Sequence, residues 1–207
     1  MALSYTALLH IFRCEPELIL DRLTAAEAVA AEQRLSVFLS PHILRGAALL
    51  LLSETKEAIA SLRTGLPPGR TGGVRLLGVC MLAAVLAQQG DDAEALAAVK
   101  EALQSVAATG EGFWNVELHR SHGLVLQSQN KLSESEAAFW QALQLARHQQ
   151  AKSWELRAAT SLARLWGEQG RRAEARDLLA PIYGSFTEGF ATADLKEAKA
   201  LLGALDA

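Results

Sequence analysis

The sequence predicts an all-α fold built from repeated pairs of antiparallel helices. Alanine and leucine recur at spacings of three and four residues, which is typical of helices, whereas the alternation expected of strands never persists. A short turn also recurs at intervals of 40 residues, at Gln89-Gly90, Gln129-Asn130 and Gln169-Gly170. Glycine and asparagine tolerate the left-handed conformation that ends a helix, so each turn is expected to stop one helix just before the next begins.

Small residues at matching positions support this repeat. Earlier, degraded copies of the turn are predicted at Cys14 and Ser53. The residue seven places before each turn is small in every copy: Ala7, Gly46, Ala83, Gly123 and Ala163. Small side chains let stacked helices approach closely, and repeats of this length favour solenoids. We therefore expect a tetratricopeptide-like right-handed solenoid of about five antiparallel helix pairs plus a C-terminal capping helix, with the first helix of each pair lining a concave face.

The helices are predicted to follow one another along a single domain, residues 1–207. The pairs are expected at about 3–33, 37–64, 74–108, 113–150 and 154–183, with the capping helix at 192–205. In the first pair, Pro16 stands at the first position of the second helix, where its missing N–H costs nothing. In the second pair, Pro41 is expected to kink or delay the first helix.

Polar residues predict the starts of the later helices. Asp91 is expected to cap the second helix of the third pair, and Ser153 the first helix of the fifth pair. Ser133 and Glu136 have the spacing of a capping box in the fourth pair. Thr192 is expected to begin the capping helix, which a solenoid needs because its last repeat has no neighbour to cover it.

Composition excludes several classes of function. The net charge of −3 provides no basic field for a nucleic-acid backbone. Cys14 and Cys80 have no partner at CxxC spacing, which indicates a reduced, intracellular chain. No signal peptide and no run of about 20 apolar residues is found, so we expect a cytoplasmic protein with no nucleic acid and no membrane as partner.

Particular segments resemble a known group of proteins. They are SWELRAATSLARLW at 153–166, EARDLLAPIY at 174–183, FTEGF at 186–190 and DLKEAK at 194–199, with further matches upstream at 117–120 and 43–46 and a weaker one at 9–13. These segments are similar to the C-terminal region of bacterial signalling proteins in which an adenylate/guanylate cyclase domain, or another sensor or DNA-binding domain, precedes an AAA-type ATPase and a tetratricopeptide region. The resemblance implies that the cyclase and ATPase chemistry lies in other domains, and that this chain corresponds to their helical sensor or scaffold region.

The repeat register predicts a polar binding surface on the fourth and fifth pairs. The side chains expected on the concave face are Glu117, Arg120, Gln127, Arg157, Arg164 and Glu168. Such a mixture of charges suits a peptide that carries both signs, or another copy of the chain. A solvated helix face explains the same residues almost as well.

Two apolar surfaces are also candidates for docking. Leu77, Cys80 and Ala84 occupy the concave positions of the third pair, and would form a docking surface or a dimer contact if exposed. Most aromatic residues of the C-terminal half are expected in the core. Phe113 and Trp140 are the predicted exceptions, which would act as binding anchors.

A metal site is a remote alternative. His119 and His122 lie three apart on one predicted helix, near Glu117, and so share a face. Zinc would need a third or fourth ligand, such as Glu155 or His148 supplied by the fold. Partly buried structural histidines are the preferred interpretation, and no metal or cofactor is predicted.

Nucleotide and nucleophile chemistry are rejected. The glycine-rich loop at 65–73 lacks the spacing and the lysine of a phosphate-binding loop. Cys14 and His10 are four residues apart on a helix, but no oxyanion site accompanies them. The sequence therefore predicts a non-catalytic interaction or scaffold module, and the resemblance implies that it regulates a cyclase or ATPase. The alternatives are a self-associating dimer, which could exchange helix pairs through the 65–73 hinge, and, remotely, an enzyme or metal-binding protein.

Overall fold

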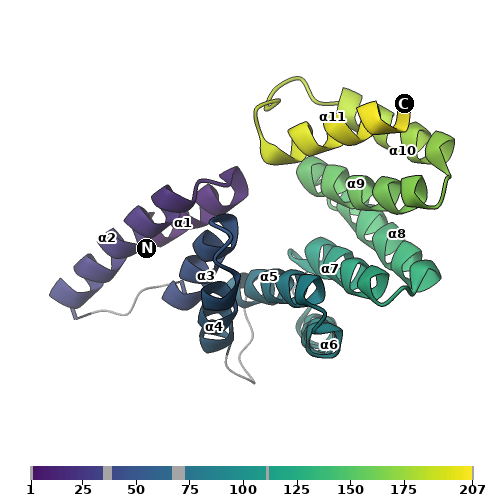
Figure 1. The fold of residues 1–207 in the computed structure, drawn as a ribbon. Helices are drawn as coiled ribbons and strands as arrows, with labels where there is room; N and C mark the ends of the chain where they lie inside the picture. Colours follow the sequence, from purple (N-terminus) through teal and green to yellow (C-terminus); the bar gives the residue numbers. More distant parts are fainter. Residues whose placement is uncertain (1, 35–38, 67–72, 111, 207) are drawn as a thin grey trace. The chain divides into compact units, whose positions relative to one another are not determined.

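The computed structural model describes residues 2–34, 39–66, 73–110 and 112–206. The described residues form eleven α-helices and no strand (Figure 1). They divide into two compact units, unit 1 (Met1–Asp91) and unit 2 (Asp92–Ala207). The all-α class predicted from the sequence is confirmed.

Unit 1 contains five helices. They are α1 (Ala2–Arg13), α2 (Pro16–Glu32), α3 (Pro41–Leu51), α4 (Thr55–Gly65) and α5 (Gly73–Gln89). Helix α1 packs against α2 and α3, and α3 packs against α4 and α5. Helices α1 and α3 therefore each contact both their partner and the first helix that follows, as stacked pairs require.

Unit 2 contains six helices. They are α6 (Asp92–Thr109), α7 (Asn115–Ser128), α8 (Leu132–His148), α9 (Lys152–Glu168), α10 (Arg172–Gly184) and α11 (Ala193–Asp206). Helix α7 packs against α8 and α9, and α9 packs against α10 and α11 (Figure 1). Helices α7, α9 and α11 thus follow one another in one layer. The predicted 74–108 pair has α5 in one unit and α6 in the other, and the single-domain organisation stays a prediction.

The recurring turns adopt the conformation that the sequence predicts. The backbone φ is positive at Cys14, Ser53, Gly90, Asn130 and Gly170, with values from 56° to 83°. In each turn the next residue donates its N–H to the carbonyl five positions back, as Lys131 does to Leu126 at 2.9 Å. This bond closes a Schellman-type helix end. The period of the turns is therefore a period of helix ends.

The small residues predicted to allow close packing are all buried. Ala7, Ala83 and Ala163 have no exposed surface, and Gly46 and Gly123 are buried as well. Sixteen positions after each lies a large buried residue: Leu23, Leu62, Val99, Phe139 and Leu179.

The two glycines among these positions show why a small residue is needed. A Cβ atom on Gly46 would lie 2.6 Å from Leu62 Cγ, and one on Gly123 would overlap the ring of Phe139. Both distances are shorter than a carbon–carbon contact allows. The first helix of these pairs therefore approaches the second more closely than any side chain permits.

Two predicted caps are wrong. Helix α8 begins at Leu132 after Lys131, and α9 begins at Lys152 after Ala151, so neither Ser133 nor Ser153 stands at a cap. The tight turn before each helix sets its start, because the residue that closes the turn also accepts the first hydrogen bond of the helix, as Lys131 does from the N–H of Ser135 at 2.9 Å. Glu136, predicted in the capping box, bonds to other helices instead.

Two other helix starts agree better with the sequence. Pro41 delays its helix, since α3 begins at this residue and not at 37; residues 35–38 lie outside the described ranges. Helix α11 begins directly after Thr192, whose carbonyl accepts the N–H of Lys196 at 3.1 Å.

Residues 67–72 of the glycine-rich loop are outside the described part of the chain, so the predicted hinge stays a prediction. Across the residues that are described, no helix combines the length and the apolar character needed to cross a bilayer.

Candidate functional site

The six side chains predicted to line a binding face lie on two neighbouring helices of unit 2. Glu117, Arg120 and Gln127 belong to α7, and Arg157, Arg164 and Glu168 belong to α9. Their spacings of three, four and seven residues keep each set on one helix face. The structure joins the two faces at both ends, since Gln127 Nε2 donates to Glu168 Oε2 at 2.9 Å and Arg157 pairs with Glu117.

Glu117 is the buried centre of this face, with 3% of its surface exposed. Its Oε2 accepts hydrogen bonds from Arg120 Nε at 3.0 Å and from Arg120 Nη2 at 2.9 Å. Its Oε1 lies 3.0 Å from Arg157 Nη1. Burial would raise the pKa of Glu117, but the two guanidinium groups outweigh burial and lower the pKa. The carboxylate therefore stays ionised and holds both arginines in place.

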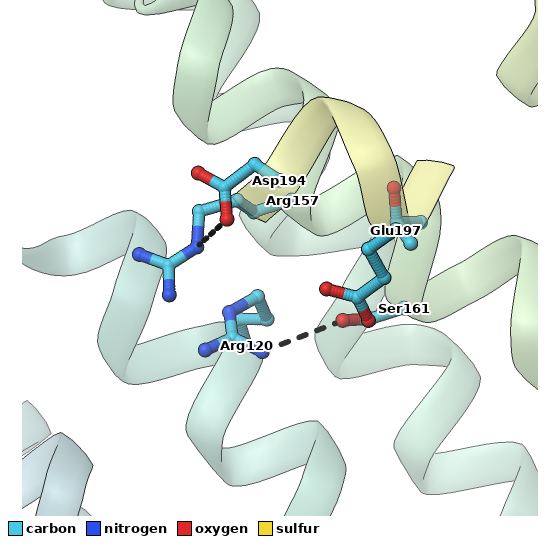
Figure 2. Close-up of a pocket in the computed structure, with 6 residues that line it drawn as sticks. Arg120, Arg157, Ser161, Asp194 and Glu197 are labelled. Carbon is cyan, nitrogen blue, oxygen red and sulfur yellow. Dashed lines mark hydrogen bonds and ion pairs between the residues drawn. The ribbon is translucent and has the colours of Figure 1, made fainter. Parts of the chain in front are cut away.

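Helix α11 adds two carboxylates to the same face. Asp194 Oδ1 lies 3.5 Å from Arg157 Nε, and Glu197 Oε1 lies 2.5 Å from Arg164 Nη2. Arg120 Nη1 reaches Ser161 Oγ at 3.5 Å (Figure 2). Between these groups is a polar pocket of about 60 Å³, lined by Arg120, Arg157, Thr160, Ser161, Asp194 and Glu197.

The contribution of α11 was missed by the sequence reasoning, which treated 192–205 only as a cap. The period of the repeat contains the missing signal. Glu197 follows Arg157 by 40 residues, and Asp194 follows Trp154 by 40 residues. The capping helix therefore places its side chains as the first helix of a further repeat would.

Asp194 is held less firmly than Glu117. Burial raises the pKa of Asp194, and the nearby carboxylates of Glu117 and Glu197 act in the same direction, although Arg157 opposes them. Its 3.5 Å separation from Arg157 Nε is also longer than a good hydrogen bond. The buried Glu117 thus stays ionised and holds two arginines of the pocket, whereas Asp194 in the pocket lining is held only weakly.

An aromatic surface adjoins the start of α9. The Phe113 side chain is 68% exposed, as predicted, and its ring centre lies 5.2 Å from that of the half-buried Trp154. Trp114 stacks behind them, 5.4 Å from Trp154. Trp140, the other predicted exception, is half-buried against Trp166 with ring centres 5.8 Å apart.

The apolar docking surface predicted on the third pair is not available. Leu77 and Cys80 are each only 5% exposed, and Ala84 is half-buried. Leu77 and Cys80 therefore lie in the packed interior. The expectation depended on their exposure and is therefore wrong for this face.

The predicted alternative of a metal site finds no support in the geometry. Glu117 is already paired with Arg120 and Arg157. Throughout the described ranges, no group of three or more His, Cys, Asp or Glu side chains is arranged to hold a metal ion.

In unit 1, His10 Nδ1 lies 2.6 Å from Glu15 Oε2, so its ring is oriented by this carboxylate.

Comparisons with known proteins complete this description. No protein-family model matches the chain, and no curated protein sequence matches it either. Solved structures do match. A Rap protein complexed with Competence and Sporulation Factor has a TM-score of 0.75 and 15% identity over 98% of this chain, and PlcR of Bacillus thuringiensis, complexed with the peptide PapR7 and DNA, has 0.74 and 12% over 99%. The tetratricopeptide-like repeats of a putative kinesin light chain from Podospora anserina have a TM-score of 0.60 and 16% identity over 88% of this chain.

The fold is a tetratricopeptide-like solenoid. At identities of 12–16%, these likenesses concern the fold alone. The chain spans 63% of the length of the Rap protein, 72% of PlcR and 92% of the kinesin light chain repeats. Proteins of this architecture typically serve as interaction modules that hold other chains on their concave faces.

Proposed function

We propose that this chain is a non-catalytic interaction module that binds a peptide segment on the face formed by α7, α9 and α11. The observation that carries the proposal is the polar pocket, in which charged side chains from three helices converge around the buried Glu117. Two structural neighbours support it, since PlcR is complexed with the peptide PapR7 and the Rap protein with Competence and Sporulation Factor. These partners, and the DNA bound by PlcR, are properties of those proteins.

The arrangement of the pocket is suited to recognition because its groups are fixed before a ligand arrives. Arg120 donates twice to a carboxylate that is itself buried, so its guanidinium has little freedom to lose on binding. Preorganised groups bind more tightly because less conformational entropy is lost. The pocket also offers both donors and acceptors, which an extended peptide backbone needs.

The biological setting is a further part of the proposal. The resemblance to the C-terminal region of cyclase–ATPase signalling proteins supports a regulatory role in a bacterial signalling system, in the cytoplasm. Among the described residues neither Cys14 nor Cys80 forms a disulfide, which agrees with a reducing compartment.

Selection from a random peptide library displayed on phage would test the proposal. We expect the purified chain to retain peptides with micromolar affinity, as measured by isothermal titration calorimetry. Replacing Arg120 with alanine should weaken this binding. The matched control is Arg176→Ala, which removes an arginine that pairs with Asp206 at 2.5 Å outside the pocket. Failure to select any peptide, or equal affinity for the two variants, would contradict the proposal.

Self-association, the alternative predicted from the sequence, is distinguished with the same material. Light scattering over a range of protein concentrations would show a dimer if this alternative holds. A molar mass that stays at that of one 22.2 kDa chain would exclude it.

A further inference from the structure

Arg157 has more hydrogen-bonding capacity than its neighbours use. A guanidinium carries five N–H donors. The structure gives Arg157 two ion pairs, at 3.0 Å to Glu117 and 3.5 Å to Asp194, and among the described residues neither has hydrogen-bond geometry. Its side chain is 29% exposed and lines the pocket (Figure 2). The pocket therefore contains a fixed cation whose N–H groups can still donate hydrogen bonds to a ligand.

The ion pair between Asp194 and Arg157 is weak. Its carboxylate belongs to α11, which is held in unit 2 by the buried side chains of Leu195, Ala198 and Leu205. The helix thus does not depend on Asp194 for its position. A carboxylate supplied by a ligand could pair with Arg157 through two parallel hydrogen bonds, which are stronger than the single long contact of Asp194.

The surface next to Arg157 is aromatic. Trp154 precedes Arg157 by three residues on α9, so the two side chains are neighbours on one helix face. Phe113 lies against Trp154 and is the most exposed of the large apolar side chains described. Exposed aromatic rings of this kind serve as anchors at binding surfaces.

We infer that the ligand is a peptide whose acidic side chain pairs with Arg157 in place of Asp194, and whose adjacent aromatic side chain packs on Phe113 and Trp154. This inference rests on the proposed function and specifies its ligand. A basic side chain is disfavoured because the carboxylates that it would approach, Asp194 and Glu197, are already paired with Arg157 and Arg164. It would also face two fixed guanidinium groups at the pocket wall.

Four capped heptapeptides in a glycine–serine background would test the inference. Their central pairs are Glu-Phe, Gln-Phe, Lys-Phe and Glu-Ala, and their affinities for the full chain are measured by fluorescence anisotropy. We expect the Glu-Phe peptide to bind about tenfold more tightly than each of the others, since every other peptide lacks one of the two contacts.

Variants of the chain sharpen this test. Asp194→Asn removes the internal competitor and should tighten binding of the Glu-Phe peptide about threefold to tenfold. The matched control is Asp206→Asn, which removes an α11 carboxylate paired with Arg176 outside the pocket and should leave the affinity unchanged. Arg157→Lys keeps a positive charge beside Glu117, so that unit 2 stays folded, but loses the planar fork of donors and should weaken binding.

The outcomes separate this inference from the proposed function. Tightest binding by the Lys-Phe peptide, or weaker binding by Asp194→Asn, would overturn the inference while leaving peptide binding itself intact. The same holds if peptides selected from the phage library bind but the Glu-Phe peptide does not. Failure of every peptide, selected or designed, would overturn both.

Discussion

Units 1 and 2 place equivalent repeat positions in opposite chemical surroundings. Leu77 lies six residues before the small residue Ala83 of unit 1 and is buried, whereas Glu117 lies six residues before Gly123 of unit 2 and pairs with arginine. Three residues before the small residue of their repeats, unit 1 has the buried Ile43 and Cys80, and unit 2 has Arg120. The repeat determines where a side chain lies, and its chemical type then decides whether the position becomes core or an ionic pocket. Unit 2 should therefore be the part whose stability responds to charge and pH.

The tryptophans allow this difference to be measured. Trp114, Trp140, Trp154 and Trp166 all lie in unit 2. Tryptophan fluorescence during urea denaturation therefore reports on unit 2 alone, whereas circular dichroism reports on the helices of both units. The following predictions are ordered by the size of their expected effect.

The largest effect is expected for Glu117→Gln. This change removes the buried charge that pairs with both Arg120 and Arg157, so unit 2 should lose about 3 kcal/mol of its free energy of unfolding. Fluorescence-detected urea denaturation measures it. Glu168→Gln, an exposed change at the end of the same face, is the control. Equal losses in the two variants would mean that the ionic centre does not stabilise unit 2.

A smaller effect is expected when the close approach of helices is disturbed. Gly123→Ala forces a Cβ atom against the rigid ring of Phe139 and should destabilise unit 2 by about 2 kcal/mol. Gly46→Ala in unit 1 should cost less, because Leu62 can change its rotamer. Combining Gly123→Ala with Phe139→Leu should cost less than the sum of the two single changes. Additive effects would contradict direct contact.

Acid should weaken unit 2 before unit 1. Burial lowers the pKa of His119 to about 4. In the unfolded state this histidine therefore binds a proton near pH 6.5, whereas in the folded state it stays neutral until about pH 4. Stability is therefore lost as the pH falls through this window, by on the order of 1 kcal/mol between pH 7 and pH 5 after allowance for solvent screening. The pH dependence of the fluorescence-detected urea midpoint measures the loss. His119→Leu should flatten it, and an unchanged slope would exclude His119 as its source.

The smallest effect is expected where Arg171 packs on Trp166. Arg171 lies 4.5 Å above the ring of Trp166, and both bond to Glu136, with Trp166 Nε1 donating at 2.8 Å. Arg171→Ala should shift the fluorescence emission to longer wavelength as water reaches the indole, with a stability loss below that of Gly123→Ala. Arg172→Ala, an exposed neighbour, is the control, and an equal spectrum for both variants would contradict the stacking.

Much of the ionic face of α7 and α9 could be located from the sequence because repeat positions are set by local geometry. The spacing within these helices places Glu117 and Arg120 on one face of α7, and Arg157 and Arg164 on one face of α9, whatever their partners are. That this face binds a partner stays a prediction. The starts of α8 and α9 were misjudged for a related reason. A serine can cap a helix, but a closed turn one or two residues earlier supplies the first carbonyl and makes the serine unnecessary.

From the residue pattern alone follow the helical class, the helix ends at left-handed residues and the positions that must be small, because each depends on backbone geometry within a few neighbours. Folding in three dimensions decided the rest. It buried Glu117 between two arginines, moved Leu77 into the interior, and brought Asp194 and Glu197 to the arginines of α9. Burial and pairing depend on contacts between residues about 40 positions apart, whose energies no local pattern contains.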